Sequence, residues 1–531
     1  MKKKTLSFIT AMAAAAAMVP NVISGTAHAE ENSLPASCDL SSTYLFPTIN
    51  NQSYGSCASH STTYYQFSYE ARKKYFEKTG IVPNFSYDPL YTYNQINYGI
   101  DEGSTIVNAY NVLKNKGAVP YGLITNEILT ESEYEQLSEV EKLGYYSRLY
   151  YDRQNDVYYN KYIANHNYIV NDMQTKCEAL KVRLTDVHSK HMLFLDKEHD
   201  LNVLKSWLND GKVITTYGDF KYEVKENLRA AKNPYNGKTE YALAKNVHSD
   251  DDPGHAFTIV GYDDNIACDV NNDGYIDEEK EKGAFKIANS HGKNWMNDGY
   301  LWVMYDAVYY ASEFSELNGK NSAGLKRVPA FSSNLFYTID VDFKDVKLIS
   351  EAEIETSDFY DIDVSTYNNG HIVSIDNNVY ATESDHNLKS EALAYNGSII
   401  SDITELCDEN YLNGSTFNVK VHNHGEDTKI NVKAIRLRDD KGNLVAEKII
   451  DDDTSEDEGY VCDIIKSISL DIKPGDVNYD GIVDDSDRDA INSYISGDIY
   501  SFSLLQQDIM DIDHDGSITE DDITSFNELL N

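Results

Sequence analysis

The sequence predicts an α+β fold in its first part, then a β-sandwich, and a small α-helical calcium-binding region at the end. Three patterns predict this order. Apolar residues recur at helical spacing from Ala58 to about Phe76, β-prone runs follow at 254–262 and 284–290, and two Asp-rich loops near the C-terminus each lead into an amphipathic helix. A chain of 531 residues is long enough for about three domains.

Composition limits the possible partners. The formal net charge is −41, and residues 474–531 hold 15 Asp and Glu against one basic residue, Arg488. Such a surface repels nucleic acids and anionic membranes, and it suits calcium ions and basic partners. The six cysteines form no CxxC pair and no regular framework, so we expect ordinary cores to stabilise the fold, with Cys407 and Cys462 as one possible disulfide.

Residues 1–29 have the features of a secretory signal peptide. Residues 2–4 are lysines, residues 6–19 are mostly apolar, and Ala27-His28-Ala29 fits a cleavage site. No other apolar stretch is long enough to cross a bilayer. We therefore expect a soluble mature protein that is secreted and extracellular.

Cys57 is the first candidate functional residue. It follows Gly55 and Ser56 and precedes the predicted helix, which Gly80 is expected to end. At a helix N-terminus the N–H groups and the macrodipole favour a thiolate, which is the nucleophilic form of cysteine. Alone, this position is more typical of a small buried cysteine, so the assignment depends on finding a base.

The middle of the chain predicts helices and one strand. Residues 103–117 predict a helix ended by Gly117, residues 201–208 a helix ended by Gly211, and residues 213–217 a strand. The Tyr-rich and charged segment from about 130 to 199 contains helical stretches. We interpret it as an insertion that packs against the parent domain.

A base and an orienting group follow in the two β-prone runs. His255 opens the first run, and Asn289 lies near the end of the second. Two strands of one sheet can hold these side chains next to each other, and with Cys57 they form a nucleophile–base–orienter set. A lone histidine in an apolar strand is more often a structural residue, so the three segments carry weight only together.

These segments resemble the papain family of cysteine peptidases, whose signatures are N-Q-G-x-x-G-S-C-W-A-F-S, a histidine at the start of a β-run, and K-N-S-W-G-x-x-W-G-x-x-G-Y. One residue is missing between Gln52 and Cys57, and Ala58 and His291 stand where the family has tryptophan. The matching residues are Asn51, Gln52, Gly55, Ser56, Cys57, Ser61, Asn289, Ser290, Gly292, Trp295, Gly299 and Tyr300.

The resemblance implies a papain-like two-lobed peptidase over residues 30–326, with a helical lobe and a β lobe. It also implies the catalytic roles. Cys57 attacks a peptide carbonyl, His255 exchanges the proton, Asn289 orients His255, and the Gln52 amide with the Cys57 N–H forms the oxyanion hole. His291 in place of tryptophan would shield the Asn–His contact less and adds a second titrating group.

A partial calcium loop lies between His255 and Asn289. Gly274 sits at its sharp turn, but position 12 is Lys280, so Glu279 or Glu281 would have to complete the site. An acidic, solvated loop is an equally good interpretation. The candidate ligands are Asp269, Asn271, Asp273 and the carbonyl of Tyr275.

Residues 327–472 alternate strand-like runs with turns. The runs include 336–341, 417–421 and 430–434, and the turns include Asn413-Gly414 and residues 441–443. The pattern predicts a β-sandwich accessory domain whose expected role is spacing or stability.

Residues 474–531 contain a calcium loop twice. Oxygen-bearing residues occupy positions 1, 3, 5, 9 and 12, glycine occupies position 6, and position 7 offers a carbonyl. Two copies in tandem are very improbable by chance. The expected ligands are Asp476, Asn478, Asp480, Ile482, Asp484 and Asp487 in the first loop and Asp511, Asp513, Asp515, Ser517, Thr519 and Asp522 in the second.

The aspartate at position 12 and the single helix after each loop resemble a type-I-like dockerin over residues 474–531. Dockerins fold around calcium and bind a cohesin module of a scaffoldin in the cellulosome. The resemblance implies structural Ca²⁺ in two sites, with a possible third in the peptidase domain, and a cellulosome-associated location. No organic cofactor is expected. In the family, the residues at 485–486 and 520–521 contribute to the choice of cohesin.

Together these patterns predict a secreted cysteine endopeptidase that hydrolyses protein or peptide substrates while docked on a scaffold. Two alternatives stay open. One is a catalytically inactive papain-like protein that acts as a scaffold-bound binding module. The other is amide-group transfer by the same Cys–His machinery.

Overall fold

The structure is a computed structural model that combines helices and sheets in a mixed α/β fold. The predicted signal peptide, residues 1–29, lies outside the described residues. Within the described part, no helix has both the length and the apolar character needed to cross a membrane. The structure describes residues 34–530 apart from 53–54, 98–102, 125–127, 139–144, 153–156, 165–171, 193, 195, 219–226, 234–236, 249–253, 278, 321–325, 376, 378–393, 451–460 and 499–500.

One large sheet organises the first part of the chain. Its order is β11-β12-β8-β7-β10-β6-β14-β5, with β1 paired to β10 and a direct pairing of β10 with β11. Outside the large sheet, β9 (Val247–His248) and β13 (Lys326–Arg327) form a separate two-stranded ladder. The strands of the large sheet are β1 (Ser37–Asp39), β5 (Val182–His191), β6 (Ile214–Gly218), β7 (Leu228–Lys232), β8 (Thr239–Leu243), β10 (His255–Ala267), β11 (Lys282–Ala288), β12 (Tyr300–Met304) and β14 (Leu335–Phe343).

A long helix begins at Cys57 and ends at Gly80, which adopts a left-handed φ of 68°. Hydroxyls of β6 and β10 hold its start, because Thr215 and Thr258 donate hydrogen bonds to the Ser61 carbonyl at 3.4 and 3.2 Å. The predicted helices and the strand at 213–217 are confirmed. The helical elements of this part are α1 (Cys57–Ser59), the π-helical segment η2 (His60–Phe67), α2 (Ser68–Thr79), α3 (Pro89–Tyr93), α4 (Ile106–Asn115), α7 (Met173–Ala179), α8 (Lys197–Asn209) and α9 (Tyr305–Val308).

The segment from 130 to 199 corrects the sequence interpretation. Its first half forms a three-stranded sheet in the order β2-β4-β3, which was not expected, while α5 (Glu131–Tyr134) and α7 are the helical stretches that were. The strands are β2 (Ile128–Thr130), β3 (Tyr145–Asp152) and β4 (Val157–Ala164). Tyrosine favours strands, and β3 and β4 are rich in it. The second half enters the large sheet as β5, so it belongs to the parent fold.

Two four-stranded antiparallel sheets follow and enclose a common hydrophobic core. They begin at Leu348, so the boundary expected at residue 327 is corrected. The predicted strand at 336–341 exists as β14, but it pairs with β5 and β6 of the large sheet. The sheets are β18-β15-β20-β21 and β17-β16-β19-β22, formed by β15 (Leu348–Thr356), β16 (Ile362–Asn368), β17 (His371–Ile375), β18 (Tyr395–Asp402), β19 (Asn413–Asn423), β20 (Ile430–Asp439), β21 (Leu444–Ile449) and β22 (Cys462–Asp471).

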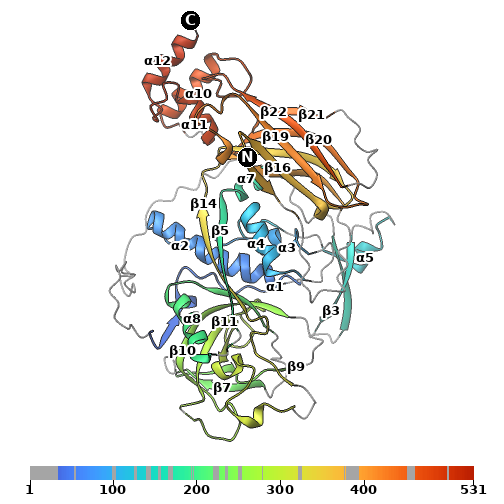
Figure 1. Cartoon of the computed structure of the whole chain (residues 1–531), viewed down its shortest axis with the longest axis vertical. Helices are drawn as coiled ribbons and strands as arrows, with labels where there is room; N and C mark the ends of the chain where they lie inside the picture. Colours follow the sequence, from blue (N-terminus) through green and yellow to red (C-terminus); the bar gives the residue numbers. More distant parts are fainter. Residues whose placement is uncertain are drawn as a thin grey trace.

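Three helices end the chain and pack onto these two sheets (Figure 1). Ile491, Leu505, Ile509 and Phe526 of the helices belong to the same hydrophobic core cluster as the strands. The helices are α10 (Asp485–Ile495), α11 (Leu504–Met510) and α12 (Glu520–Leu529). The C-terminal helices and the two sheets therefore share one core.

A buried carboxylate, Asp440, connects all three parts of the molecule. It follows β20, its Oδ1 accepts the N–H of Leu504 at 2.9 Å, and its Oδ2 forms an ion pair with Lys181 at 3.0 Å. Lys181 lies just before β5, and Leu504 begins α11. The three parts are thus joined by direct contacts at one residue.

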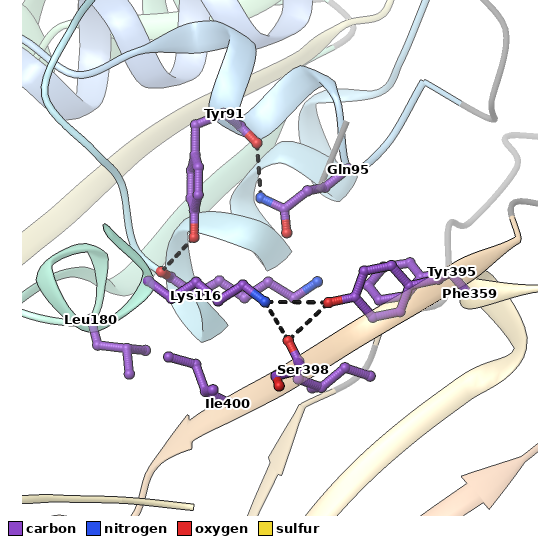
Figure 2. A pocket seen from close by; sticks show the side chains of 10 residues that line it. Tyr91, Gln95, Lys116, Leu180, Phe359, Tyr395, Ser398 and Ile400 are labelled. Atoms are coloured by element: carbon purple, nitrogen blue, oxygen red, sulfur yellow. Dashed lines mark hydrogen bonds between the residues drawn. The ribbon is translucent and has the colours of Figure 1, made fainter. Parts of the chain in front are cut away.

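A small pocket separates α3, α4 and α7 from the two-sheet region (Figure 2). On one side the ammonium group of Lys116 lies 4.8 Å from the centroid of the Phe359 ring. Buried Lys176 donates hydrogen bonds to the Tyr395 hydroxyl at 3.2 Å and to the Ser398 carbonyl. Burial lowers the pKa of Lys176 to about 8.

Lys176→Met is expected to raise the free energy of unfolding at pH 7 by about 1–3 kcal/mol. A lysine whose pKa falls from 10.5 to about 8 destabilises the folded state below pH 8, and about 1.4 kcal/mol corresponds to each unit. The Tyr395 hydroxyl keeps its own 2.9 Å hydrogen bond to the Ser398 carbonyl, so the variant leaves that carbonyl with a donor.

The pH dependence of urea unfolding checks this. The free energy of unfolding of the wild type should rise between pH 8 and 10.5, because in that range Lys176 is protonated in the unfolded chain but largely neutral in the folded one. The variant should show no such rise. The exposed Lys114→Met is the control and should change neither quantity. A variant less stable than the wild type at pH 7 would contradict the argument.

Candidate active site

The structure places Cys57 at the first residue of its helix, as predicted. Ser56 precedes it without a side-chain cap, and the Cys57 side chain is half-buried. The thiol lies close enough to His255 of β10 for each group to shift the pKa of the other. Cysteine and histidine, 198 positions apart in sequence, therefore meet where the helix start crosses the sheet.

His255 and Asn289 also meet, because β10 and β11 are antiparallel neighbours with Thr258 opposite Ala288. Nε2 of His255 lies 2.7 Å from Oδ1 of Asn289. An amide oxygen can only accept, so Nε2 carries a proton, and Nδ1 is the nitrogen left for the Cys57 thiol. The Ser290 N–H also donates to Oδ1 at 2.7 Å and fixes which end of the amide faces the ring.

The pair favours the charged state. Burial raises the pKa of the Cys57 thiol, but the hydrogen bond and the charge of His255 outweigh burial, and the thiol pKa is lowered overall. Burial lowers the pKa of His255, yet Cys57 and then Asn289 raise it above the ordinary value. The opposite holds for Cys177, Cys268 and Cys407, where burial raises the thiol pKa to about 12. Both shifts are in the direction that favours a thiolate–imidazolium pair at Cys57 and His255.

Gln52 lies in a short ladder beside Asn289. Its N–H donates to the Ser290 carbonyl at 2.8 Å, and Asn51 pairs with His291 in an antiparallel bridge. The Ser290 hydroxyl donates to the Gln52 Oε1 at 2.5 Å. This bond orients the amide, so its NH₂ end is the group that can donate to a ligand. The ladder keeps Gln52 next to the site although one residue is missing before Cys57.

His291 covers the His255 ring. The two rings are stacked, with centroids 5.1 Å apart and planes 11° apart, and Trp295 lies edge-on to His291 at 5.9 Å. Burial and the nearby charge of His255 lower the pKa of His291 to about 4. A neutral imidazole thus covers the His255 ring at neutral pH.

The loop between β10 and β11 has the same internal hydrogen bonds as the two C-terminal loops. In each, the first aspartate accepts the N–H groups of the fifth and sixth residues: Asp269 at 3.0 and 2.8 Å, Asp476 at 3.1 and 2.9 Å, and Asp511 at 3.1 and 3.0 Å. Asn271, Asp273 and Tyr275 lie in the first loop, around this turn, as expected. The structure therefore gives all three loops one local architecture.

A buried carboxylate closes each loop. Asp487 and Asp522 are fully buried, and Glu281 is 1% exposed. Each accepts the N–H of the second loop residue, at 2.7 to 2.9 Å. Of the two glutamates that the sequence leaves open, Glu281 takes this position, while Glu279 is exposed.

The C-terminal loops fit a divalent cation. Single carboxylate oxygens of Asp511, Asp513 and Asp522 lie within 4.8 Å of one another. In the first loop, burial raises the pKa of Asp476, and the like charges of Asp487 and Asp480 raise it further. Convergent carboxylates without a basic partner suit Ca²⁺, which binds six to eight oxygens. Asn478, Asp480, Ile482 and Asp484 lie in the first loop, and Asp513, Asp515, Ser517 and Thr519 in the second, at the positions that the sequence predicts.

Sequence reasoning missed several contributors to the site. The sequence indicates Ser290 only as a motif match, although its hydroxyl orients Gln52, and it assigns no role to His60, which is buried beside Ser56. The six cysteines all lie within the described residues and form no disulfide, so the possible bridge between Cys407 and Cys462 is not formed. The order of residues in a strand carries no signal for such side-chain contacts across the sheet.

Comparisons with known proteins find matches among solved structures. No family model and no curated protein matches the chain. Xylellain, a cysteine protease from Xylella fastidiosa, is 18% identical over 61% of this chain and 94% of its own, with a TM-score of 0.31. Digestive procathepsin L 3 of Tenebrio molitor is 12% identical over 58% and 71%, with a TM-score of 0.29. ProCathepsin B S9 from Trypanosoma congolense is 13% identical over 59% and 79%, with a TM-score of 0.31.

These similarities are low, so the chemistry rests on the geometry of this chain. A thiolate-forming cysteine contacts an imidazole whose other nitrogen is held by a carboxamide. This arrangement can attack an electrophilic carbonyl and return a proton to the leaving group.

Proposed function

We propose that the protein is a secreted cysteine endopeptidase that hydrolyses peptide bonds with Cys57, His255 and Asn289. The observation that carries the proposal is the joint geometry of the three side chains. Cys57 contacts His255, and Asn289 accepts the Nε2 proton of His255 at 2.7 Å. Secretion rests on the signal-peptide pattern of residues 1–29.

The mechanism follows from the protonation states. The Cys57 thiolate attacks the peptide carbonyl carbon, and the oxygen becomes an oxyanion next to the Cys57 N–H and the Gln52 NH₂ group. The His255 imidazolium gives its Nδ1 proton to the amine, the C–N bond breaks, and a thioester remains. Neutral His255 then takes a proton from water, the hydroxide oxygen attacks the thioester, and the acid product leaves while Cys57 is restored.

The pKa pattern favours catalysis over a purely binding role. A binding module needs no thiolate, yet the Cys57 pKa is lowered although burial opposes it. Buried ion pairs persist where the surrounding structure holds them in place, and such perturbed groups cluster at functional sites.

Epoxide labelling under reducing conditions tests the activity. We expect a thiol-directed epoxide to modify Cys57 alone and to abolish the cleavage of a peptide library, with Cys57→Ala as the unlabelled, inactive control. If the full-length wild-type protein stays unlabelled at pH 7, the inactive binding module is the function that remains. Labelling without peptide hydrolysis, but with transfer of the acyl group to an added amine, would favour amide-group transfer.

We propose further that residues 474–531 bind a cohesin module of a scaffoldin in a calcium-dependent manner, so that the peptidase is carried on a cellulosome. Support comes from the two loops that fit Ca²⁺ and from side chains left exposed on α10 and α12. Tyr494 is 36% exposed, and Leu529 and Leu530 are 48% and 41% exposed. Pull-down with a cohesin panel, with and without EDTA, tests this; calcium-independent binding would refute it.

A third Ca²⁺ is proposed at Asp269, Asn271, Asp273 and the Tyr275 carbonyl, with Glu281 as the closing carboxylate. The loop joins the strand of His255 to the strand that leads to Asn289, so a cation there would stiffen the connection between base and orienter.

A further inference from the structure

One phenol hydroxyl links the three chain segments of the candidate active site. Tyr65 lies on the helix that begins at Cys57, two turns after it. Its hydroxyl donates to the Asn289 carbonyl at 2.8 Å and accepts the Asn50 N–H at 3.0 Å. Asn50 begins the segment that leads to Gln52. The nucleophile helix, the oxyanion-hole segment and the orienter therefore meet at one oxygen atom.

The hydroxyl adds a side-chain contact to a backbone ladder that joins two of these segments. The Asn50 carbonyl accepts the Gly292 N–H at 2.9 Å, and the Gln52 N–H donates to the Ser290 carbonyl at 2.8 Å. These two bonds join the Gln52 segment to the Asn289 segment. Tyr65 alone among the side chains described here bonds both segments and also stands on the Cys57 helix.

The phenol is held rigidly and stays neutral. Tyr65 is fully buried, its ring stacks on Phe46 with centroids 5.4 Å apart and planes 5° apart, and Tyr64 packs edge-on at 5.2 Å. Burial raises the pKa of Tyr65, so the hydroxyl keeps the proton that it donates to Asn289. A rigid donor on a packed helix defines the position of its acceptor closely.

Given the proposed peptidase function, we propose that Tyr65 is a positioning residue, whose hydroxyl sets where Asn289 and Gln52 lie relative to the Cys57 thiol. Asn289 is held at both ends, by Tyr65 at its carbonyl and by Ser290 N–H and His255 at its side-chain oxygen. Loss of the hydroxyl loosens the carboxamide that holds the His255 ring and the segment that carries the oxyanion donor. The His255 ring and the oxyanion donor both contribute more to stabilising the transition state than to binding the substrate.

Tyr65→Phe tests this role, with Tyr262→Phe as the matched control. Tyr262 is also buried, and its hydroxyl donates to one backbone carbonyl, that of Pro35, at 2.7 Å. Both variants lose a buried hydrogen bond, so both should lower the melting temperature. Only Tyr65→Phe should lower kcat, by about 10- to 100-fold, with KM changed less than about 2-fold. Rates are compared at a temperature where near-ultraviolet circular dichroism shows each variant folded.

The pH profile of Cys57 alkylation gives a readout that does not need peptide cleavage. Iodoacetamide modification, followed by mass spectrometry of the Cys57 peptide, should shift to higher pH in Tyr65→Phe, because a looser His255 stabilises the thiolate less. Tyr262→Phe should keep the wild-type profile.

The outcomes are distinguishable. If wild type cleaves no peptide but Tyr65→Phe still shifts the alkylation profile, the peptidase function fails and the positioning role stands. An unchanged kcat and an unchanged profile in folded Tyr65→Phe would overturn the role, and so would equal losses in both variants.

Discussion

Replacing His255 with alanine is expected to lower kcat/KM for peptide hydrolysis by about 10⁴-fold or more, a size typical for the loss of one member of a catalytic set. Two losses explain the lower kcat/KM. The variant loses the proton donor for the leaving amine, and it loses the charge and hydrogen bond that lower the Cys57 pKa against the effect of burial. Without His255, burial and the thiol's ordinary chemistry favour the protonated form.

Steady-state kinetics and the pH dependence of alkylation measure the two effects separately. Wild type should begin to react as a thiolate at a lower pH than His255→Ala, because His255 lowers the Cys57 pKa. His188→Ala removes an exposed histidine paired with Asp340 and is the control. Full activity in His255→Ala would reject the site assignment.

Removal of calcium is expected to unfold the C-terminal helices and to lower the melting temperature of the whole chain by 10 °C or more. Each site contributes about 4 kcal/mol when free calcium is about 1,000 times its Kd. Without a cation the carboxylates of Asp511, Asp513 and Asp522, which converge within 4.8 Å, repel one another. Because Ile491 and Phe526 also belong to the core of the two sheets, the loss reaches beyond the helices.

Calorimetric titration and thermal unfolding with EDTA check this prediction. We expect three Ca²⁺ per chain, and two in either Glu281→Gln or Asp522→Asn. Glu279→Gln, which alters an exposed glutamate of the same loop, should still bind three. A melting temperature that EDTA leaves unchanged would contradict calcium as a structural cofactor, and two ions in wild type would remove the site closed by Glu281.

Local patterns predicted the elements that carry the candidate site, because each depends on residues close in sequence. A helix from Cys57 to Gly80, a strand opened by His255 and a strand before Asn289 all follow from short motifs and periodicity. The tandem loops were equally visible, because their oxygen-bearing residues alternate within a dozen positions.

Contacts between distant segments could not be predicted in the same way. The run at 336–341 reads as a strand, but its alternation does not say which sheet it joins, and it pairs with β5 and β6. The choice of Glu281 over Glu279 depends on which side chain turns inward. The role of Tyr65 depends on the meeting of residues 50, 65 and 289, which no local spacing reveals.

The contacts of Asp440 have a consequence for the proposed docking on a scaffold. A catalytic domain on a flexible linker samples many orientations, and the distance it can cover grows with the length of the linker. Here one carboxylate bonds the terminal helices and the first part of the chain at once, and Ile491, Leu505 and Phe526 of those helices share a core with the two sheets. Under the proposed docking and peptidase function, an anchored copy would therefore present Cys57 and His255 in a fixed orientation, and it would cut only polypeptides that reach that position.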